Sequence, residues 1–122
     1  MNKLFIAVLL LGLLSGCTSQ FITFSGESKS WTGKYTATID GNEEHGSYEF
    51  HFKDGNENTQ FEVLDININN GKSTKSEENV KGATMTLSSN CRGCSVTGKG
   101  EKQKVTIKWD DKKEETFYLQ KK

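Results

Sequence analysis

After residue 30, most of the chain alternates hydrophobic and polar residues in short runs, which is the pattern of β-strands with one buried face. The hydrophobic positions of these runs are Trp31, Tyr35, Ala37 and Ile39, then Tyr48, Phe50 and Phe52, then Ala83, Met85 and Leu87, and finally Val105, Ile107 and Trp109. Turn-forming sequences rich in Gly, Asn and Asp follow at 40–42, 54–56, 69–71 and 98–100. No stretch keeps a helical period over several turns. The pattern therefore predicts an all-β domain.

The last two runs predict how the chain ends. Phe117 and Leu119 match the run 105–109 across a polar turn at 110–115, which indicates a final hairpin. Six or seven strands in a chain of this length favour a small immunoglobulin-like antiparallel β-sandwich. The Cys…Trp…Cys spacing of antibody-type domains is absent, so the expected likeness is one of architecture alone.

The middle of the chain is less regular. Phe61 and Val63 share one parity, whereas Leu64 begins a hydrophobic series of the other parity. A bulge or a break near residue 64 would reconcile the two series, because one extra residue moves the following side chains to the other face. The segment 72–79 is polar throughout and is predicted to be a loop.

Residues 1–16 differ from everything that follows them. Lys3 supplies a short positive start, and residues 4–14 form an apolar run. A helix needs about 20 apolar residues to cross the hydrocarbon of a bilayer, so this run is too short. Its length and its flanking charge are typical of the hydrophobic region of a secretory signal peptide. We therefore expect residues 1–16 to direct export and to be removed.

The sequence Leu14-Ser15-Gly16-Cys17 resembles the lipobox of bacterial lipoprotein signal peptides. The resemblance implies that Cys17 receives a diacylglyceryl group through a thioether, is acylated further and becomes the first residue of the mature protein. It also implies a location on the outer face of the bacterial cell membrane, held by membrane lipid. Two or more acyl chains give stable anchoring where one chain is marginal. The expected organisation is a signal peptide at 1–16, a lipidated tether at 17–20 and a β-sandwich domain at 21–122. The alternative is an ordinary signal peptide with a cysteine at this position.

Both ends of the mature chain also resemble small lipoproteins of Gram-positive, Bacillus-like bacteria, a group that is mostly uncharacterised. The residues that carry the likeness are Phe24-Ser25-Gly26-Glu27-Ser28 with Trp31 and Tyr35, and the closing run 105–109 with Glu115 and Leu119. This resemblance supports the expected location and fold, and it implies no activity.

Charge narrows the possible functions. The 16 basic residues balance the 16 acidic ones, so the formal net charge of the 122-residue chain is +0. A generic nucleic-acid binder needs a basic excess to meet phosphate, so we expect no nucleic-acid partner. Acidic residues predominate before residue 90 and basic residues after it, a distribution that we interpret as solvated strand faces.

Cys91-Arg92-Gly93-Cys94 is a C-x-x-C motif with two open interpretations. In an exported chain whose Cys17 carries lipid, Cys91 and Cys94 remain as a pair in an oxidising setting. The motif lies between strand-like segments rather than at a helix N-terminus, where the helix dipole would lower the thiol pKa. This setting favours a structural disulfide. A thiol–disulfide redox protein that uses the same pair is the alternative.

The sequence predicts neither a zinc site nor a calcium site. Zinc would need ligands beyond the two cysteines, and the chain offers only His45, expected in a turn, and His51, expected on a polar strand face. The order of Asp54, Asn56 and Asn58 imitates the first ligand positions of a calcium loop. Thr59 and Asp65 stand where that loop has its glycine and its bidentate glutamate, so a hairpin turn explains the sequence better.

Catalytic patterns are equally weak, because the chain has no G-x-S-x-G sequence and its histidines lack a motif. The carboxylate pairs at 43–44, 77–78 and 114–115 lie in polar stretches where we expect them to be exposed. Trp31 and Trp109 are interpreted as core aromatics. The sequence thus predicts no catalytic, cofactor-binding or metal residues. We expect a monomeric, non-catalytic binding or interaction module whose ligand the sequence does not identify.

Overall fold

The computed structural model describes residues 19–93, 96–98 and 100–121, and it is all-β. Strands make up 71% of the described chain, in which no helix occurs. The strands are β1 (Gln20–Glu27), β2 (Trp31–Asp40), β3 (Glu43–Phe52), β4 (Gln60–Ile68), β5 (Ser73–Lys81), β6 (Thr84–Arg92), β7 (Gln103–Trp109) and β8 (Lys113–Lys121). The predicted all-β class is confirmed.

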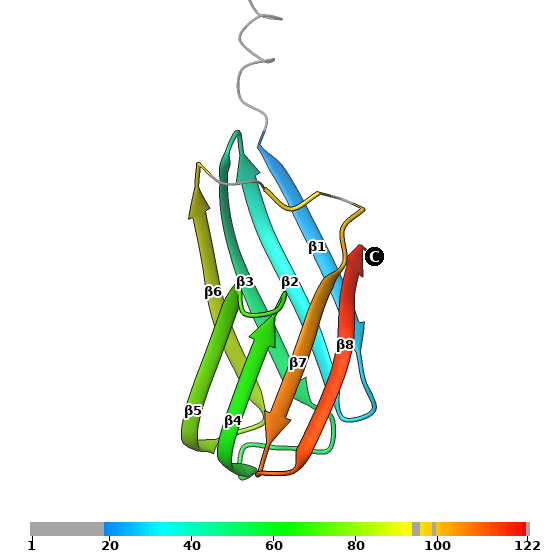
Figure 1. Cartoon of the computed structure of the whole chain (residues 1–122), viewed down its shortest axis with the longest axis vertical. Coiled ribbons are helices and arrows are strands. Elements are labelled where there is room, and N and C mark those ends of the chain that lie inside the picture. The colour runs from blue at the N-terminus through cyan, green and yellow to red at the C-terminus, as the bar shows by residue number, and fades with distance from the viewer. Residues whose placement is uncertain (1–18, 94–95, 99, 122) are drawn as a thin grey trace, which may run out of the picture.

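All eight strands belong to one antiparallel sheet in the order β5-β4-β7-β8-β1-β2-β3-β6, and this sheet curls into a nearly closed barrel (Figure 1). A short pairing of β1 with β8, at Phe24↔Lys121 and Ser25↔Gln120, joins its two halves. The expected immunoglobulin-like sandwich of six or seven strands is not confirmed, because one continuous sheet encloses the core. Strands β5 and β6 are the two ends of this sheet, so the barrel is open between them.

Two strands of the structure, β1 and β5, are not among those that the sequence predicts. β1 precedes the first predicted strand, although Ile22 and Phe24 alternate and are buried. The prediction of a loop at 72–79 is wrong, because β5 pairs with β4 from Ser73 to Lys81. This strand is held by backbone hydrogen bonds at the edge of the sheet, and edge strands carry polar and charged side chains without losing their ladder. Side-chain alternation therefore gave no sign of it.

The expected irregularity near residue 64 is present. Phe61 and Leu64 are both buried at 2% exposure despite their opposite parity, so the strand changes face between them. The β4–β5 ladder pairs Phe61 with Val80 and Val63 with Glu78 and skips the position between them. The skipped residue on β5, Asn79, has a φ of 53°, in the left-handed region. The break therefore lies at residues 62–63, just before the predicted position.

The predicted final hairpin is confirmed, with Val105 opposite Phe117 and Gln103 opposite Leu119. Its turn is shorter than expected, because β8 already begins at Lys113. Asp110 and Asp111 make the reversal with φ values of 50° and 68°. Aspartate tolerates this left-handed conformation better than most residues.

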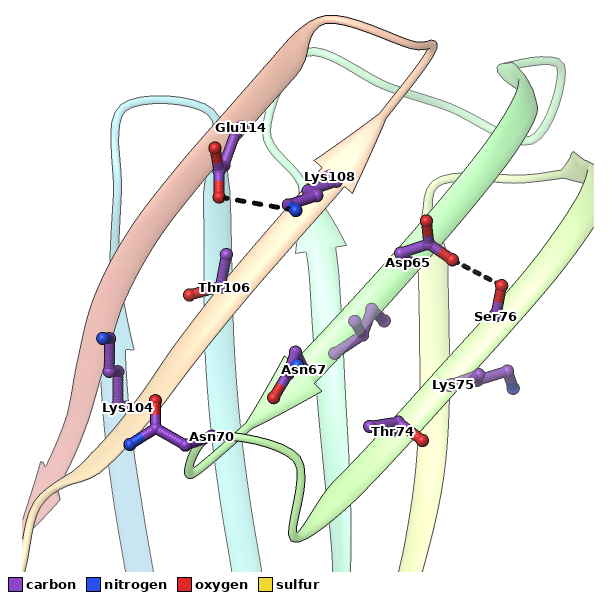
Figure 2. Close-up of a pocket in the computed structure, with 11 residues that line it drawn as sticks. Asp65, Asn67, Asn70, Thr74, Lys75, Ser76, Lys104, Thr106, Lys108 and Glu114 are labelled. Carbon is purple, nitrogen blue, oxygen red and sulfur yellow. Dashed lines mark hydrogen bonds and ion pairs between the residues drawn. The ribbon is translucent and has the colours of Figure 1, made fainter.

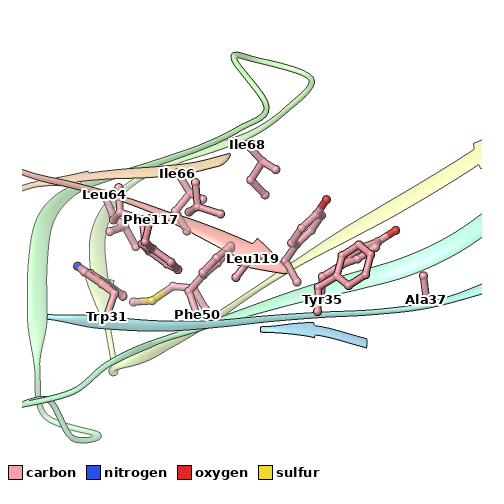
Figure 3. Packing of buried hydrophobic residues seen from close by; sticks show 14 of the residues in the cluster. Trp31, Tyr35, Ala37, Phe50, Leu64, Ile66, Ile68, Phe117 and Leu119 are labelled. Atoms are coloured by element: carbon pink, nitrogen blue, oxygen red, sulfur yellow. The ribbon is translucent and has the colours of Figure 1, made fainter. Parts of the chain in front are cut away.

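One hydrophobic cluster fills the barrel (Figure 3). Aromatic residues of β2 and β3 form one wall, and Leu64, Ile66 and Ile68 of β4 face them. Trp31 is fully buried, and its ring lies 5.6 Å from that of Trp109. The expectation that both tryptophans are core residues is therefore confirmed. Such close aromatic pairs add to the stabilisation that burial of their area gives.

Candidate functional site

A recess of about 580 Å³ opens at the end of the barrel where β1 begins and β6 ends (Figure 1). Its walls come from β3, the β4–β5 turn, β5, β6, the connection between β6 and β7, and β7, through Glu44, Tyr48, Asn69, Lys72, Ser73, Ser88, Ser89, Asn90, Cys91, Thr97, Glu101 and Gln103. Nearly all of these side chains are polar. The mouth of a β-barrel is a common place for a ligand site.

Glu44 is the most unusual residue of this recess. The expectation that the pair 43–44 lies exposed in a turn is wrong for Glu44, which is only 7% exposed on β3. Its carboxylate accepts hydrogen bonds from the Tyr35 hydroxyl, from the Thr97 backbone N–H at 2.6 Å and from Thr97 Oγ1 at 2.9 Å. A buried carboxylate is tolerated when donors replace the lost water, and here three donors do so.

Two stacked tyrosines connect Glu44 to the core. The rings of Tyr35 and Tyr48 lie 4.3 Å apart, and a Cβ at Gly46 would overlap the Tyr35 ring. The missing side chain at Gly46 therefore gives Tyr35 the room to reach Glu44. The Tyr48 hydroxyl donates a hydrogen bond to Oε1 of Gln103, which is 2% exposed.

Both tyrosines are held in their neutral form. Burial raises the pKa of Tyr35, and its hydrogen bond to Glu44 and the negative charge of that residue raise it further. Burial also raises the pKa of Tyr48, with the charge of Glu44 as the next cause, while the bond to Gln103 acts in the opposite direction. The two hydroxyls thus act as fixed donors, and the network Tyr35–Glu44–Thr97 with Tyr48–Gln103 presents a preorganised polar surface to the recess.

Of the two cysteines in the C-x-x-C motif, the structure describes only Cys91. It lies near the end of β6 and lines the recess. Cys94 lies outside the described residues, so the disulfide between Cys91 and Cys94 stays a prediction. The expected strand after the motif does not follow directly, because Val96–Gly98 are not in a strand and β7 begins only at Gln103.

Both histidines lie on β3, and neither lines the recess. His45 was expected in a turn but belongs to β3, where its Nδ1 lies 3.1 Å from Oδ1 of Asn90. His51 lies on the exposed face of the same strand, as expected, with Nδ1 2.9 Å from Oγ1 of Thr84. Five residues of strand lie between the two histidines, which places their Cα atoms about 20 Å apart. In the part of the chain that the structure describes, no three His, Cys, Asp or Glu side chains gather as a metal site would require.

The calcium-like sequence forms a turn that satisfies itself. The side-chain oxygen of Asn56 accepts the Asn58 backbone N–H at 2.8 Å, and Oγ1 of Thr59 accepts the Asn56 backbone N–H at 2.9 Å. Gly55 donates its backbone N–H to the carbonyl of Phe52. The oxygens of Asn56 and Thr59 therefore serve a local turn. The expected hairpin at this turn is wrong, because the strands it connects, β3 and β4, are not neighbours in the sheet.

A second polar cluster lies between β1, β2 and β8. Glu115 accepts hydrogen bonds from Ser28 Oγ at 2.5 Å, Ser30 N–H at 2.8 Å and Ser30 Oγ at 2.6 Å. Burial acts to raise the pKa of Glu115, but these hydrogen bonds outweigh it and hold the pKa below its usual range. The expectation of exposed carboxylates at 114–115 is therefore wrong for Glu115. These hydrogen bonds join the turn between β1 and β2 to β8, and we interpret the cluster as structural.

The outer face of the sheet carries another hollow, of about 460 Å³, between β4, β5 and β7 (Figure 2). Most of its side chains are polar, and two pairs of them interact: the Ser76 hydroxyl donates to Asp65, and the Lys108 ammonium lies 4.0 Å from the Glu114 carboxylate. Figure 2 shows these pairs lying across the strands. Exposed ion pairs of this kind contribute little, and we interpret the surface as a solvated strand face.

Residues 1–18, with the predicted lipidation site Cys17, lie outside the described residues. Within the described ranges, no helix has the length and apolarity needed to span a bilayer. The chain matches no family model, no curated protein and no solved structure.

Proposed function

We propose that this protein is a membrane-anchored, extracytoplasmic lipoprotein whose barrel is a non-catalytic binding module. The sequence Leu14-Ser15-Gly16-Cys17 supports the anchor. Only Thr18 and Ser19 separate Cys17 from Gln20, where β1 begins. Three extended residues span about 10 Å, so a lipid on Cys17 holds the start of β1 close to the bilayer.

The observation that carries the binding proposal is the buried polar network in the wall of the recess. Fully buried positions in a protein are most often apolar. Here Glu44, Tyr48 and Gln103 face the recess instead, and each is oriented by a hydrogen bond within the protein. Preorganised polar groups fix the orientation of a ligand at low entropic cost. We therefore propose that the recess binds a polar ligand rich in hydrogen-bonding groups.

A titration followed by NMR tests the binding proposal. The ¹⁵N-labelled domain 18–122 is titrated with N-acetylglucosamine, glycerol, spermidine and trialanine as separate probes. We expect at least one probe to shift the amide signals of Tyr48, Ser88–Asn90 and Gln103, and we expect Gln103→Leu to abolish the shifts. Gln120→Leu, the same change at an exposed position of β8, is the matched control. Shifts that are absent for every probe, or that survive Gln103→Leu, contradict the proposal.

The anchor has its own test. Wild-type protein and Cys17→Ala are expressed in a Gram-positive host, and membranes are separated from soluble material. We expect wild type in the membrane fraction, released by detergent, and Cys17→Ala in the soluble fraction or the medium. Recovery of Cys17→Ala with the membranes would refute lipid attachment at Cys17.

A thiol–disulfide redox function is the second candidate, and the position of Cys91 in the wall of the recess favours it. A substrate thiol that entered the recess would lie beside Cys91. Measurement of the midpoint potential of the Cys91/Cys94 pair separates the two functions. A value below about −300 mV is typical of a structural bond and would contradict redox exchange, whereas a higher potential would support it.

A further inference from the structure

The free edge of β6 has a defined set of unpaired backbone groups. Ala83 accepts the Phe52 backbone N–H, and at the other end Gly93 donates to the carbonyl of Asn42. Both residues have odd numbers, and the β3–β6 register is constant between them. Because partners in an antiparallel ladder alternate, the odd residues of β6 bond to β3 and the even residues direct their N–H and C=O away from it. Ser88 and Asn90 therefore present donors and acceptors to the open side of the barrel.

Strand β5 does not use these groups. It lies at the opposite end of the sheet order, and two of its residues opposite buried residues of β4 are charged: Lys75 is opposite Ile66 and Glu77 is opposite Leu64. The Lys75 ammonium reaches across the opening and donates to the carbonyl of Thr86 at 2.9 Å. The side chain of Lys75 thus bridges the opening at Thr86, an even-numbered residue of β6. Toward its C-terminal end, β6 extends past the start of β5 (Figure 1).

The recess lies directly against this part of β6. Ser88, Ser89 and Asn90 form one wall, and Lys72 and Ser73 form the opposite one. The even residues of β6 offer backbone groups at a spacing of about 6.6 Å, the two-residue repeat of an extended chain. A segment that paired there would direct every second side chain toward the polar floor of the recess. Main-chain hydrogen bonds and alternate side-chain pockets are the two elements of recognition by strand addition.

We propose that the ligand of the recess is an extended peptide segment of a partner protein, which adds as a strand to the edge of β6 at Ser88 and Asn90. This inference rests on the proposed binding function and specifies its ligand. A second copy of the chain fits less well. Antiparallel pairing of β6 with itself inverts one barrel relative to the other, whereas two copies anchored at Cys17 in one membrane share an orientation.

Proline substitution at an even position isolates the proposed interaction. Ser88→Pro removes an N–H that faces the opening and leaves the β3 ladder intact, and proline is tolerated on edge strands in this orientation. Ser88→Ala removes only the side chain and is the matched control. Peptides are selected from a displayed random library on the domain 18–122, synthesised, and measured by calorimetry. We expect Ser88→Pro to weaken binding about tenfold or more and Ser88→Ala to change it less than twofold.

A reciprocal experiment avoids any effect of proline on folding. Each backbone nitrogen of a selected peptide is methylated in turn, and binding to the wild-type domain is measured. Strand addition predicts that methylation weakens binding at every second position and leaves the positions between them unchanged. A flat profile, or equal affinity for Ser88→Pro and wild type, overturns the inference.

Other outcomes distinguish this inference from the proposed function. If N-acetylglucosamine or another small probe binds the recess and no selected peptide does, the binding function stands and the peptide ligand is refuted. If the domain 18–122 sediments as a dimer that Ser88→Pro dissociates, the occupant of the edge is a second copy and the inference is again refuted.

Discussion

Removal of the Tyr35 hydroxyl tests whether the buried network is held together as described. Tyr35→Phe keeps the ring in its stack on Tyr48 and deletes one of the three hydrogen bonds to the Glu44 carboxylate. A hydrogen bond to a charged group contributes about 1.5–3 kcal/mol, and the cost is higher where the remaining group is buried. Because Thr97 still provides two donors, we expect a loss of about 2 kcal/mol in the free energy of unfolding.

Urea denaturation, followed by tryptophan fluorescence, measures this loss. With an m-value of about 2 kcal/mol/M for a small domain, the midpoint should fall by about 1 M without a change in slope. Tyr118→Phe is the matched control, since Tyr118 is 50% exposed on the outer face, and it should change the free energy of unfolding by less than about 0.5 kcal/mol.

A double-mutant cycle shows whether the effect passes through Glu44. In a Glu44→Gln background, Tyr35→Phe should cost about 1 kcal/mol less than in wild type, because contacting residues of one hydrogen-bonded network are coupled. If Tyr35→Phe costs no more than Tyr118→Phe, or if the cycle gives no coupling, Glu44 is not held as the structure has it and the argument for a preorganised recess fails.

Three further predictions concern other parts of the barrel. Glu115→Gln should lower the melting temperature at pH 7. The difference should shrink as the pH falls below the ordinary carboxyl range, because a carboxyl with a lowered pKa stabilises the fold above its ordinary pKa and loses this contribution as the pH falls through the lowered value. Gly46→Ala should destabilise by about 2 kcal/mol or more in urea by displacing Tyr35, whereas Gly100→Ala, with open space around it, should be nearly neutral. Lys75→Met should lower the free energy of unfolding by less than about 1 kcal/mol and should speed hydrogen exchange of the β5 amides. Unchanged exchange rates in β5 would contradict the bridging role of Lys75.

The strands that the sequence predicted are those whose side chains alternate. β2 shows the agreement best, since Trp31, Tyr35, Ala37 and Ile39 are all buried and its predicted turn follows. Alternation is a local signal, so it can be recognised in the sequence without knowledge of the partner strands. β5 lacks it because the backbone of β4, rather than a hydrophobic face, specifies this strand. The closure of the sheet through the short β1–β8 pairing depends on distant residues and has no local signature.

Glu44 illustrates what sequence reasoning missed in the recess. It has the same parity as Tyr48 and Phe50, so extending the alternation of β3 backward would have placed it inside the barrel. Its partner Thr97 is 53 residues away in the chain, and nothing in the sequence associates the two. The pattern could thus have located the buried carboxylate, but only the fold identifies the groups that make its burial tolerable.

The open side of the barrel and the polar recess adjoin each other. If positions 75 and 77 were apolar, the interior face of β5 would continue that of Ile66 and Leu64, and burial would favour closure of the sheet onto β6. Lys75 and Glu77 oppose this, because charged groups directed inward would lose their hydration. The recess adjoins this open side, and the buried residues of its wall, Glu44, Tyr48 and Gln103, are hydrogen-bonded within the protein. The charges of β5 that oppose closure and the polar lining of the recess therefore lie along the same side of the barrel.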